Sequence, residues 1–265
     1  MSEVKKTKVH LISGFLGTGK TTALKSLMEQ KDPNEKWVII VNEFGEIGID
    51  GAVLSDNGIP VAEIAGGCLC CTAGPQMGVT VQKMLRDAKP DRLMIEASGL
   101  AHAASVIDEL KAKPLDSLLE IGAVFTVVDP RQFINPDYAQ QALYKDQIGI
   151  CDVLVASKTD LCTPEQLAEF HDKAAKLFPP KAKVVEVQNA QLDIQWLDIP
   201  VIEKSRYRLK ALPDNTMGFQ SQGFTFPAGR DFDGEKLTNF FNDLHKFTDG
   251  LVRAKGVFQV LGTWV

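Results

Sequence analysis

The chain has 265 residues, of which 45% are hydrophobic and 24% are charged, and this composition excludes wholesale disorder. Its formal net charge of −5 disfavours a general nucleic-acid binder, because such proteins carry an excess of basic residues. No apolar run approaches the roughly 20 residues of a membrane span, and the N-terminus lacks the apolar stretch of a secretory signal. We therefore expect a soluble, cytoplasmic protein that binds neither nucleic acid nor membrane.

Short apolar runs rich in Val and Ile alternate with longer amphipathic stretches before residue 200. Such runs are typical of strands in a parallel sheet that is covered on both faces. The predicted strands are 9–12, 37–41, 93–95, 124–128, 153–156 and 184–187. The alternation predicts right-handed βαβ crossovers, and therefore an α/β fold with a doubly wound, mostly parallel sheet.

The segment GFLGTGKT at 14–21 follows the first predicted strand and matches G-x-x-x-x-G-K-[ST], which identifies a P-loop NTPase fold. Its glycines let backbone N–H groups surround phosphates, and the start of the following helix adds a partial positive charge. Lys20 is expected to reach the β- and γ-phosphates, and the Thr21 hydroxyl to bind Mg²⁺. The predicted phosphate-binding residues are Gly14, Gly17, Thr18, Gly19, Lys20, Thr21 and Thr22.

A third element is the run LMIEASG at 93–99, in which an apolar strand is followed by an acid and a glycine. Glu96 stands where a carboxylate would hold Mg²⁺ through water, and Gly99 could give its N–H to the γ-phosphate. The alternative is a glutamate at a strand end that precedes an ordinary turn. Lys20, Thr21 and Glu96 are the predicted catalytic residues.

The segment Ser157-Lys158-Thr159-Asp160 predicts which base is bound, because it resembles the N/T-K-x-D element of GTPases. The carboxylate of Asp160 can accept from the N1–H and exocyclic amine of guanine, and adenine offers no such donor pair. The stem of Lys158 can lie over the base. Ser157 replaces the usual Asn, so one supporting hydrogen bond is expected to be weaker. A capping box at Thr163 then begins a helix that Pro179-Pro180 is expected to end.

The pattern changes near residue 205. A charged stretch at 203–210 is interpreted as a linker, followed by a strand at 218–226, a helix at 231–245 and a strand at 251–260. We expect a nucleotide-binding domain at 1–205 and a small α+β unit at 206–265.

Three of the five cysteines, Cys68, Cys70 and Cys71, form a C-x-C-C arrangement. Thiolates select Zn²⁺, Cu⁺ and similar metals, and three of them are one ligand short of a closed tetrahedral site. Spacing alone leaves metal, redox and structural roles open. The other two, Cys151 and Cys162, are interpreted as small core hydrophobes, and His102 is a candidate metal ligand or an ordinary loop histidine.

Together, the segments at 14–22, 41–50, 63–71, 95–100 and 157–160 resemble the CobW-type metal-chaperone GTPases, which are relatives of UreG and HypB, and most of all the YeiR-like zinc-binding branch. The resemblance implies a GTPase that binds a transition metal, most often Zn²⁺, at the three clustered cysteines and delivers it to a client metalloprotein. It also suggests Glu43 as a further metal ligand. Asp50, in a switch-like loop, is the candidate for a Mg²⁺-linked residue. The C-terminal segment resembles the start of the family's C-terminal domain, short or truncated here.

We therefore predict a GTP-hydrolysing metal chaperone with GTP or GDP, Mg²⁺ and Zn²⁺ as ligands. The sequence does not decide between a monomer and a homodimer. The sequence identifies no arginine finger and no water-positioning Gln, so turnover without a partner should be slow. Two alternatives remain. One is a P-loop kinase or other nucleotide hydrolase with structural or redox cysteines, and the other is a metal buffer that responds to nucleotide.

Overall fold

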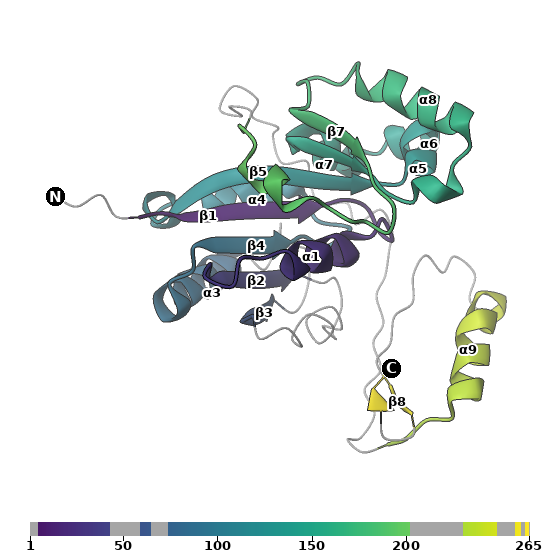
Figure 1. The fold of residues 1–265 in the computed structure, drawn as a ribbon, viewed down its shortest axis with the longest axis horizontal. Helices are drawn as coiled ribbons and strands as arrows, with labels where there is room; N and C mark the ends of the chain where they lie inside the picture. The colour runs from purple at the N-terminus through teal and green to yellow at the C-terminus, as the bar shows by residue number, and fades with distance from the viewer. Residues whose placement is uncertain are drawn as a thin grey trace.

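The computed structural model describes residues 5–42, 59–64, 74–201, 230–247, 258–260 and 263–264. Within them, seven strands form one sheet in the order β3-β2-β4-β1-β5-β6-β7, and every neighbouring pair runs parallel (Figure 1). The strands are β1 (Thr7–Ser13), β2 (Trp37–Asn42), β3 (Val61–Ile64), β4 (Arg92–Glu96), β5 (Leu119–Val128), β6 (Val153–Ala156) and β7 (Lys183–Glu186). All six predicted strands are present, and the doubly wound α/β sheet is confirmed.

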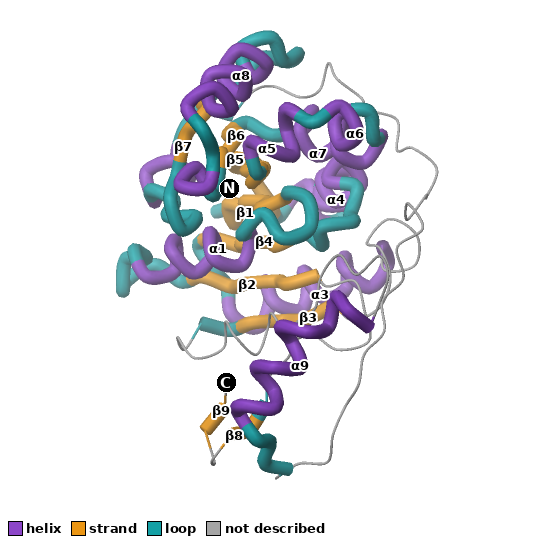
Figure 2. The backbone as a smooth tube through the Cα atoms, turned by 90° about the vertical axis from the view of Figure 1, so that its right-hand side faces the viewer, coloured by secondary structure: helices purple, strands orange, loops and turns teal. Residues whose placement is uncertain are grey.

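Helices cover both faces of this sheet. Figure 2 shows α1 on one side of the strands and α4 and α7 on the other. The helices are α1 (Lys20–Glu29), α3 (Gly74–Ala88), α4 (Ala103–Leu110), α5 (Pro130–Ile134), α6 (Pro136–Ala139), α7 (Ala142–Ile150), α8 (Pro164–Ala174) and α9 (Gly234–Phe247). Short 3-10 turns lie at η2 (Leu115–Ser117), η3 (Thr159–Leu161) and η4 (Ile194–Asp198).

Strand β2 shows why the apolar runs are continuous rather than alternating. Ile39 is buried in the core beneath α1, where it belongs to the same cluster as Leu27. Its neighbour Ile40 is buried on the opposite face, in the cluster that includes Met77 of α3. Since successive side chains point to opposite faces, a strand covered on both sides must be apolar at every position.

The predicted start of α8 is confirmed. The Thr163 hydroxyl accepts a hydrogen bond from the Gln166 amide at 3.3 Å, and the Gln166 side chain accepts one from the Thr163 amide at 2.9 Å. The predicted end is wrong, because the helix stops at Ala174, before Pro179. Leu177 lies beyond the helix but still packs against the core, so its burial does not require helical backbone.

The C-terminal region contains the predicted helix, as α9, and a short antiparallel pair formed by β8 (Gln259–Val260) and β9 (Thr263–Trp264). The ring of Phe258 contacts Phe232 and Phe241 edge to face, with centroid separations of 5.1 and 5.8 Å. Phe240 of α9 is 52% exposed. The predicted strand at 218–226 and the predicted domain boundary at 205 lie outside the described residues.

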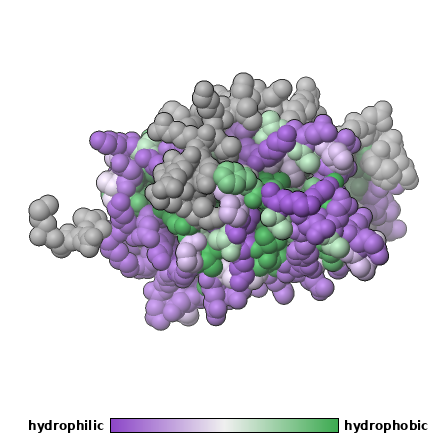
Figure 3. Space-filling view, turned by 90° about the horizontal axis from the view of Figure 1, so that it is seen from above, coloured by the Kyte–Doolittle hydropathy of each residue, from purple (hydrophilic) through white to green (hydrophobic). Residues whose placement is uncertain are grey.

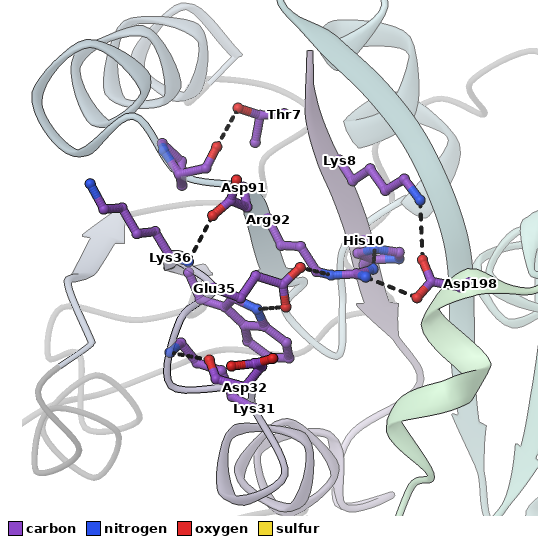
Figure 4. A network of polar contacts seen from close by, with 12 residues as sticks. Thr7, Lys8, His10, Lys31, Asp32, Glu35, Lys36, Asp91, Arg92 and Asp198 are labelled. Carbon is purple, nitrogen blue, oxygen red and sulfur yellow. Dashed lines mark hydrogen bonds and ion pairs between the residues drawn. The ribbon is translucent and has the colours of Figure 1, made fainter. Parts of the chain in front are cut away.

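At the amino-terminal end of the sheet, Arg92 organises a polar network (Figure 4). Its guanidinium donates to Glu35 at 2.7 Å, to Asp198 of η4 at 2.9 Å and to Nε2 of His10 at 3.1 Å. His10 is fully buried, and its Nδ1 lies 3.3 Å from the carbonyl oxygen of Ala123. Because a guanidinium only donates, Nε2 accepts and Nδ1 carries the proton. This network joins β1, β4, β5 and η4. It lies at the opposite end of the sheet from the sequence motifs, which follow the carboxyl ends of the strands.

The surface seen in Figure 3 is mixed, with hydrophilic side chains around smaller hydrophobic areas. Among the described residues, no helix is both long enough and apolar enough to cross a bilayer.

Candidate nucleotide-binding site

The predicted phosphate loop lies between the carboxyl end of β1 and the start of α1, in the middle of the sheet. Gly14, Gly17 and Gly19 have φ angles of +138°, +72° and +98°, which side chains other than glycine rarely adopt. At Gly14 there is also no space for a side chain, because a Cβ would lie 2.2 Å from the carbonyl oxygen of Val127 on β5. The glycine spacing of the motif is therefore required by this backbone.

Lys20 is the first residue of α1 and is 4% exposed. Its Nζ donates to the carbonyl oxygen of Phe15 at 3.0 Å, and the Thr18 hydroxyl donates to the same oxygen at 2.9 Å. The ammonium group is thus held within the loop itself. This is the position from which a lysine can counter the charge of a bound phosphate.

Thr21 and Glu96 meet across the end of the sheet. β4 pairs with β1 so that Glu96 lies opposite Ile12, one residue before the end of β1. The Thr21 hydroxyl donates to Oε1 of Glu96 at 2.8 Å, and Glu96 is 3% exposed. A hydroxyl and a carboxylate side by side are oxygen donors of the kind that Mg²⁺ takes beside substrate phosphates. These two residues fit the predicted Mg²⁺ site.

Gly99 follows β4 and lies directly against the phosphate loop. A Cβ at Gly99 would lie 2.9 Å from the backbone nitrogen of Leu16 and 2.6 Å from its Cδ2. The loop after β4 can approach the phosphate loop this closely because residue 99 has no side chain. The structure therefore brings Gly99 to the same end of the sheet as Lys20, Thr21 and Glu96.

The predicted base-recognition segment follows β6, two strands away from β1. The Ser157 hydroxyl is buried and donates to the carbonyl oxygen of Thr18 in the phosphate loop at 2.7 Å. Lys158 has left-handed backbone with φ +56°, and its side chain is 41% exposed. Asp160 is exposed on η3. The segment thus combines a buried serine that contacts the phosphate loop with two accessible charged groups.

Asp129, which is not among the predicted site residues, lies beside this segment. It is 3% exposed and accepts hydrogen bonds from the Arg131 backbone at 3.0 Å and from its guanidinium at 3.0 and 2.7 Å. Burial opposes ionisation, but the hydrogen bonds from Arg131 prevail and the pKa of Asp129 is lowered. Its carboxylate lies 4.0 Å from Nζ of Lys158. The available signal was Asp129-Pro130 after an apolar strand, which is a helix cap followed by proline.

A second segment that the sequence did not reveal follows β7. Asn189 and Ala190 both have φ +51°, and the Ala190 carbonyl lies 3.4 Å from the Ser26 hydroxyl of α1. A Cβ at Gly19 would lie 3.3 Å from that of Ala190. This loop therefore borders the start of α1. Two successive non-glycine residues in left-handed conformation have no simple sequence signature.

The predicted transition-metal ligands Cys68, Cys70, Cys71 and Glu43, together with Asp50, lie outside the described residues. Among the residues that are described, no three His, Cys, Asp or Glu side chains form a group that could hold a metal ion. His102 is buried at the start of α4, with Nδ1 3.7 Å from a carboxylate oxygen of Asp146.

The two remaining cysteines differ from each other. Cys151 is buried and its thiol donates to the Ile148 carbonyl at 3.3 Å, so its interpretation as a core residue is confirmed. The same interpretation of Cys162 is wrong, because this residue is only half-buried just after η3. Partial burial and the charge of Asp129 raise the pKa of its thiol.

Two curated zinc chaperones are similar to this chain in sequence. The chain is 46% identical over 159 residues to the zinc chaperone YeiR of Escherichia coli K12, covering 60% of this chain and 48% of that protein. It is 30% identical over 228 residues to the zinc chaperone CobW of Pseudomonas aeruginosa, covering 74% of this chain and 60% of that protein. The chain thus spans about half of one relative and three fifths of the other.

Two solved structures share the fold. Zn(II)-bound YjiA GTPase from E. coli aligns with a TM-score of 0.52 at 21% identity, over 97% of this chain and 83% of that one. HypB from Helicobacter pylori in complex with nickel aligns with a TM-score of 0.50 at 19% identity, over 73% and 83%. Residues 8–186 match the family description "CobW/HypB/UreG, nucleotide-binding domain". The chain therefore belongs to the CobW/HypB/UreG family of P-loop proteins.

Proposed function

We propose that this chain is a GTP-hydrolysing metal chaperone, in which the nucleotide state governs binding and delivery of a transition metal. The observation that carries the nucleotide half is the bond between Ser157 and Thr18. This bond supports the proposal, because it connects the segment proposed to bind guanine with the loop proposed to bind the phosphates. A site of this kind takes a nucleoside triphosphate with its base near Asp160 and its phosphates near Lys20.

The reaction is attack of water on the γ-phosphoryl group of GTP. A bond forms between the water oxygen and the γ-phosphorus, the bridging bond to the β-phosphate breaks, and GDP and inorganic phosphate leave. Lys20 counters charge on the phosphate oxygens, and the loop N–H groups orient them. Mg²⁺ bound at Thr21 and Glu96 would neutralise further phosphate charge. The buried Glu96 carboxylate holds the Thr21 hydroxyl in place.

The proposal that this chain binds and delivers a metal is supported by its sequence similarity to two zinc chaperones. In this chain the ligands would be the thiolates of Cys68, Cys70 and Cys71, with Glu43 as the fourth. Zinc is then cargo, bound in one nucleotide state and passed to a client metalloprotein, and the protein would act in the cytoplasm. Thiolates together with a carboxylate form a donor set that Zn²⁺ accepts.

Base choice tests the nucleotide half. Asp160→Asn replaces a double acceptor by a group with one donor and one acceptor, so guanine loses affinity and xanthine gains relative to it. Competition between GTP, XTP and ATP for the wild type and the variant measures this change. A preference for ATP in the wild type, or an unchanged GTP preference in the variant, would refute guanine recognition and favour a P-loop kinase.

Linkage tests the coupling between the two halves. Zn²⁺ affinity is measured by chelator competition, first with a non-hydrolysable GTP analogue and then with GDP. Coupling of about 5–150-fold between these affinities is ordinary for such a device. Replacing all three clustered cysteines by Ser should remove tight binding. Equal Zn²⁺ affinity in the two nucleotide states would leave a GTPase and a metal site without a chaperone mechanism, and Zn²⁺ binding without phosphate release would indicate a metal buffer.

A further inference from the structure

The side-chain amide of Gln147 on helix α7 is buried and contacts the loop that follows β4. Gln147 is 1% exposed, and its Nε2 donates to the carbonyl oxygens of Gly99 and Ala101, each at 3.1 Å. The backbone carbonyl of Gln147 in turn accepts from the Thr126 hydroxyl on β5 at 2.7 Å. The backbone of Gln147 is therefore bonded to the sheet, and its side-chain amide holds the loop.

The end of this loop and the start of α4 also contact the same helix. Asp146 is buried and accepts from the Ala104 amide at 3.4 Å, and it lies 3.7 Å from the ring of His102. One turn earlier, the ring of Tyr144 packs edge to face on Phe15 of the phosphate loop, with centroids 6.0 Å apart. Helix α7 thus contacts the loop after β4 at several points and the phosphate loop at another.

Both hydrogens of the Gln147 amide are used by the loop. A neutral amide has two N–H donors, and here each meets a backbone carbonyl away from water. Removing the amide would leave buried carbonyls without a donor, which costs more than an exposed hydrogen bond, so the loop would shift to reach water. A shift of the peptide groups next to Gly99 would move its N–H relative to the phosphate loop, which it touches at Leu16.

We propose that Gln147 is a positioning residue that holds Gly99 where its N–H meets the γ-phosphate, and so sets the preference of this protein for GTP over GDP. The inference rests on the proposed function, because it needs a bound guanine nucleotide. Gln147 itself touches no substrate. It acts through the carbonyls of Gly99 and Ala101. GDP lacks the γ-phosphate, so its affinity depends on the phosphate loop and the base segment but not on this contact.

Gln147→Met tests this role, because methionine has a similar length and no amide. The dissociation constants of GDP and of a non-hydrolysable GTP analogue are measured together with kcat and KM for GTP. We expect the analogue to bind about tenfold more weakly than to the wild type. This is the effect expected from the loss of one hydrogen bond to a charged group. GDP affinity should not change, and kcat should fall. Equal loss for both nucleotides would indicate general damage and overturn the proposal, as would an unchanged ratio.

Gln147→Glu supplies a readout that simple destabilisation would not move. A protonated carboxyl can donate to one of the two carbonyls, and a carboxylate can donate to neither. GTP preference in this variant should therefore recover relative to the wild type as the pH falls from about 8 to about 6, because burial raises the pKa of a carboxyl. A pH profile parallel to that of the wild type would contradict the proposal. If the Met variant does not fold, Thr126→Val provides a second test, because it removes the hydrogen bond from β5 to the Gln147 backbone. We expect this variant to lower the ratio of GTP-analogue affinity to GDP affinity, by less than Gln147→Met would.

Gln30 provides the matched control. Its Nε2 also donates to two carbonyls, those of Ser26 and Leu192, both at 2.6 Å, but at the far end of α1. Gln30→Met should lose stability and keep the wild-type ratio of GTP to GDP affinity. The two failures remain distinct: a wild type that binds no guanine nucleotide refutes the proposed function, whereas a normal wild type with an unaltered Gln147→Met ratio refutes only the role of Gln147.

Discussion

The hydroxyl of Ser157 and the carbonyl oxygen of Thr18 lie 2.7 Å apart, although 139 positions separate the two residues in the sequence. The bond is buried and joins the end of β6 to the phosphate loop. The serine at this position was expected to support the site less well than the usual asparagine. The serine hydroxyl joins the base segment to the phosphate loop.

Ser157→Ala should therefore weaken the binding of guanine nucleotides, because the hydrogen bond between the base segment and the phosphate loop is lost. The variant leaves a buried carbonyl without its donor, which costs about 1–3 kcal/mol. We expect lower affinity for both GTP and GDP, because the base segment serves both, and a lower melting temperature. Ser117→Ala is the control, since the Ser117 hydroxyl makes a local, exposed bond to Pro114 at 2.8 Å. Unchanged nucleotide binding in the Ser157 variant would show that the link is structural only.

Lys20→Ala should abolish GTP turnover and weaken GTP binding while the fold persists. The carbonyl of Phe15 that Lys20 contacts keeps the Thr18 hydroxyl as a donor, so the substitution leaves this oxygen satisfied. Phosphate release and thermal unfolding are measured on the same preparation, with Lys25→Ala on the same helix as the control. Turnover at the wild-type rate would refute the assignment of the phosphate site.

Gly99→Ala should separate the loop after β4 from the phosphate loop. The added methyl group would overlap the backbone of Leu16 at 2.9 Å, so one of the two loops must move. We expect reduced affinity for a GTP analogue with a smaller effect on GDP. In Gly78→Ala the nearest atom to the new methyl group is at 3.6 Å, and alanine favours a helix, so stability should rise slightly. Equal nucleotide affinities in the Gly99 variant and the wild type would contradict the close contact.

The strands and the phosphate loop were predictable because their signals are local. Apolar runs follow from burial on both faces, as at Ile39 and Ile40. The glycines of the motif follow from backbone angles and from the contact at Gly14. The capping box at Thr163 needs only residues three positions apart. In each case the sequence signal is short or repeats along the element, although the contact that excludes a side chain at Gly14 is made with the distant Val127.

The rest depends on partners that are distant in the sequence. Gln147 is one polar residue in an ordinary helix until the fold brings Gly99 and Ala101 to it. Asp129 acquires its position beside Lys158 from the order of the strands. The helix end at Ala174 was misplaced because proline marks where a helix cannot continue, not where packing stops supporting it. Such features follow from the tertiary structure alone.

His10 illustrates a distant effect that pH should reveal. Burial, and then the charge of Arg92, lower its pKa from an ordinary 6.5 to about 4. Below pH 6.5 the unfolded chain binds a proton that the folded protein does not, so the contribution of neutral His10 is complete above that pH and is lost as the pH falls toward 4. The shift corresponds to a loss on the order of 3 kcal/mol.

His10→Gln should flatten the dependence of unfolding free energy on pH across this window, because glutamine can accept from Arg92 and donate to Ala123 without titrating. Urea unfolding at a series of pH values measures the slope for both proteins. Asp198 does not interfere, since its hydrogen bond to Arg92 lowers its pKa to about 2 from 3.8 and its contribution is lost below the window. Identical slopes for the variant and the wild type would mean that His10 accepts a proton in the folded protein and that the network around Arg92 opens to admit the charge.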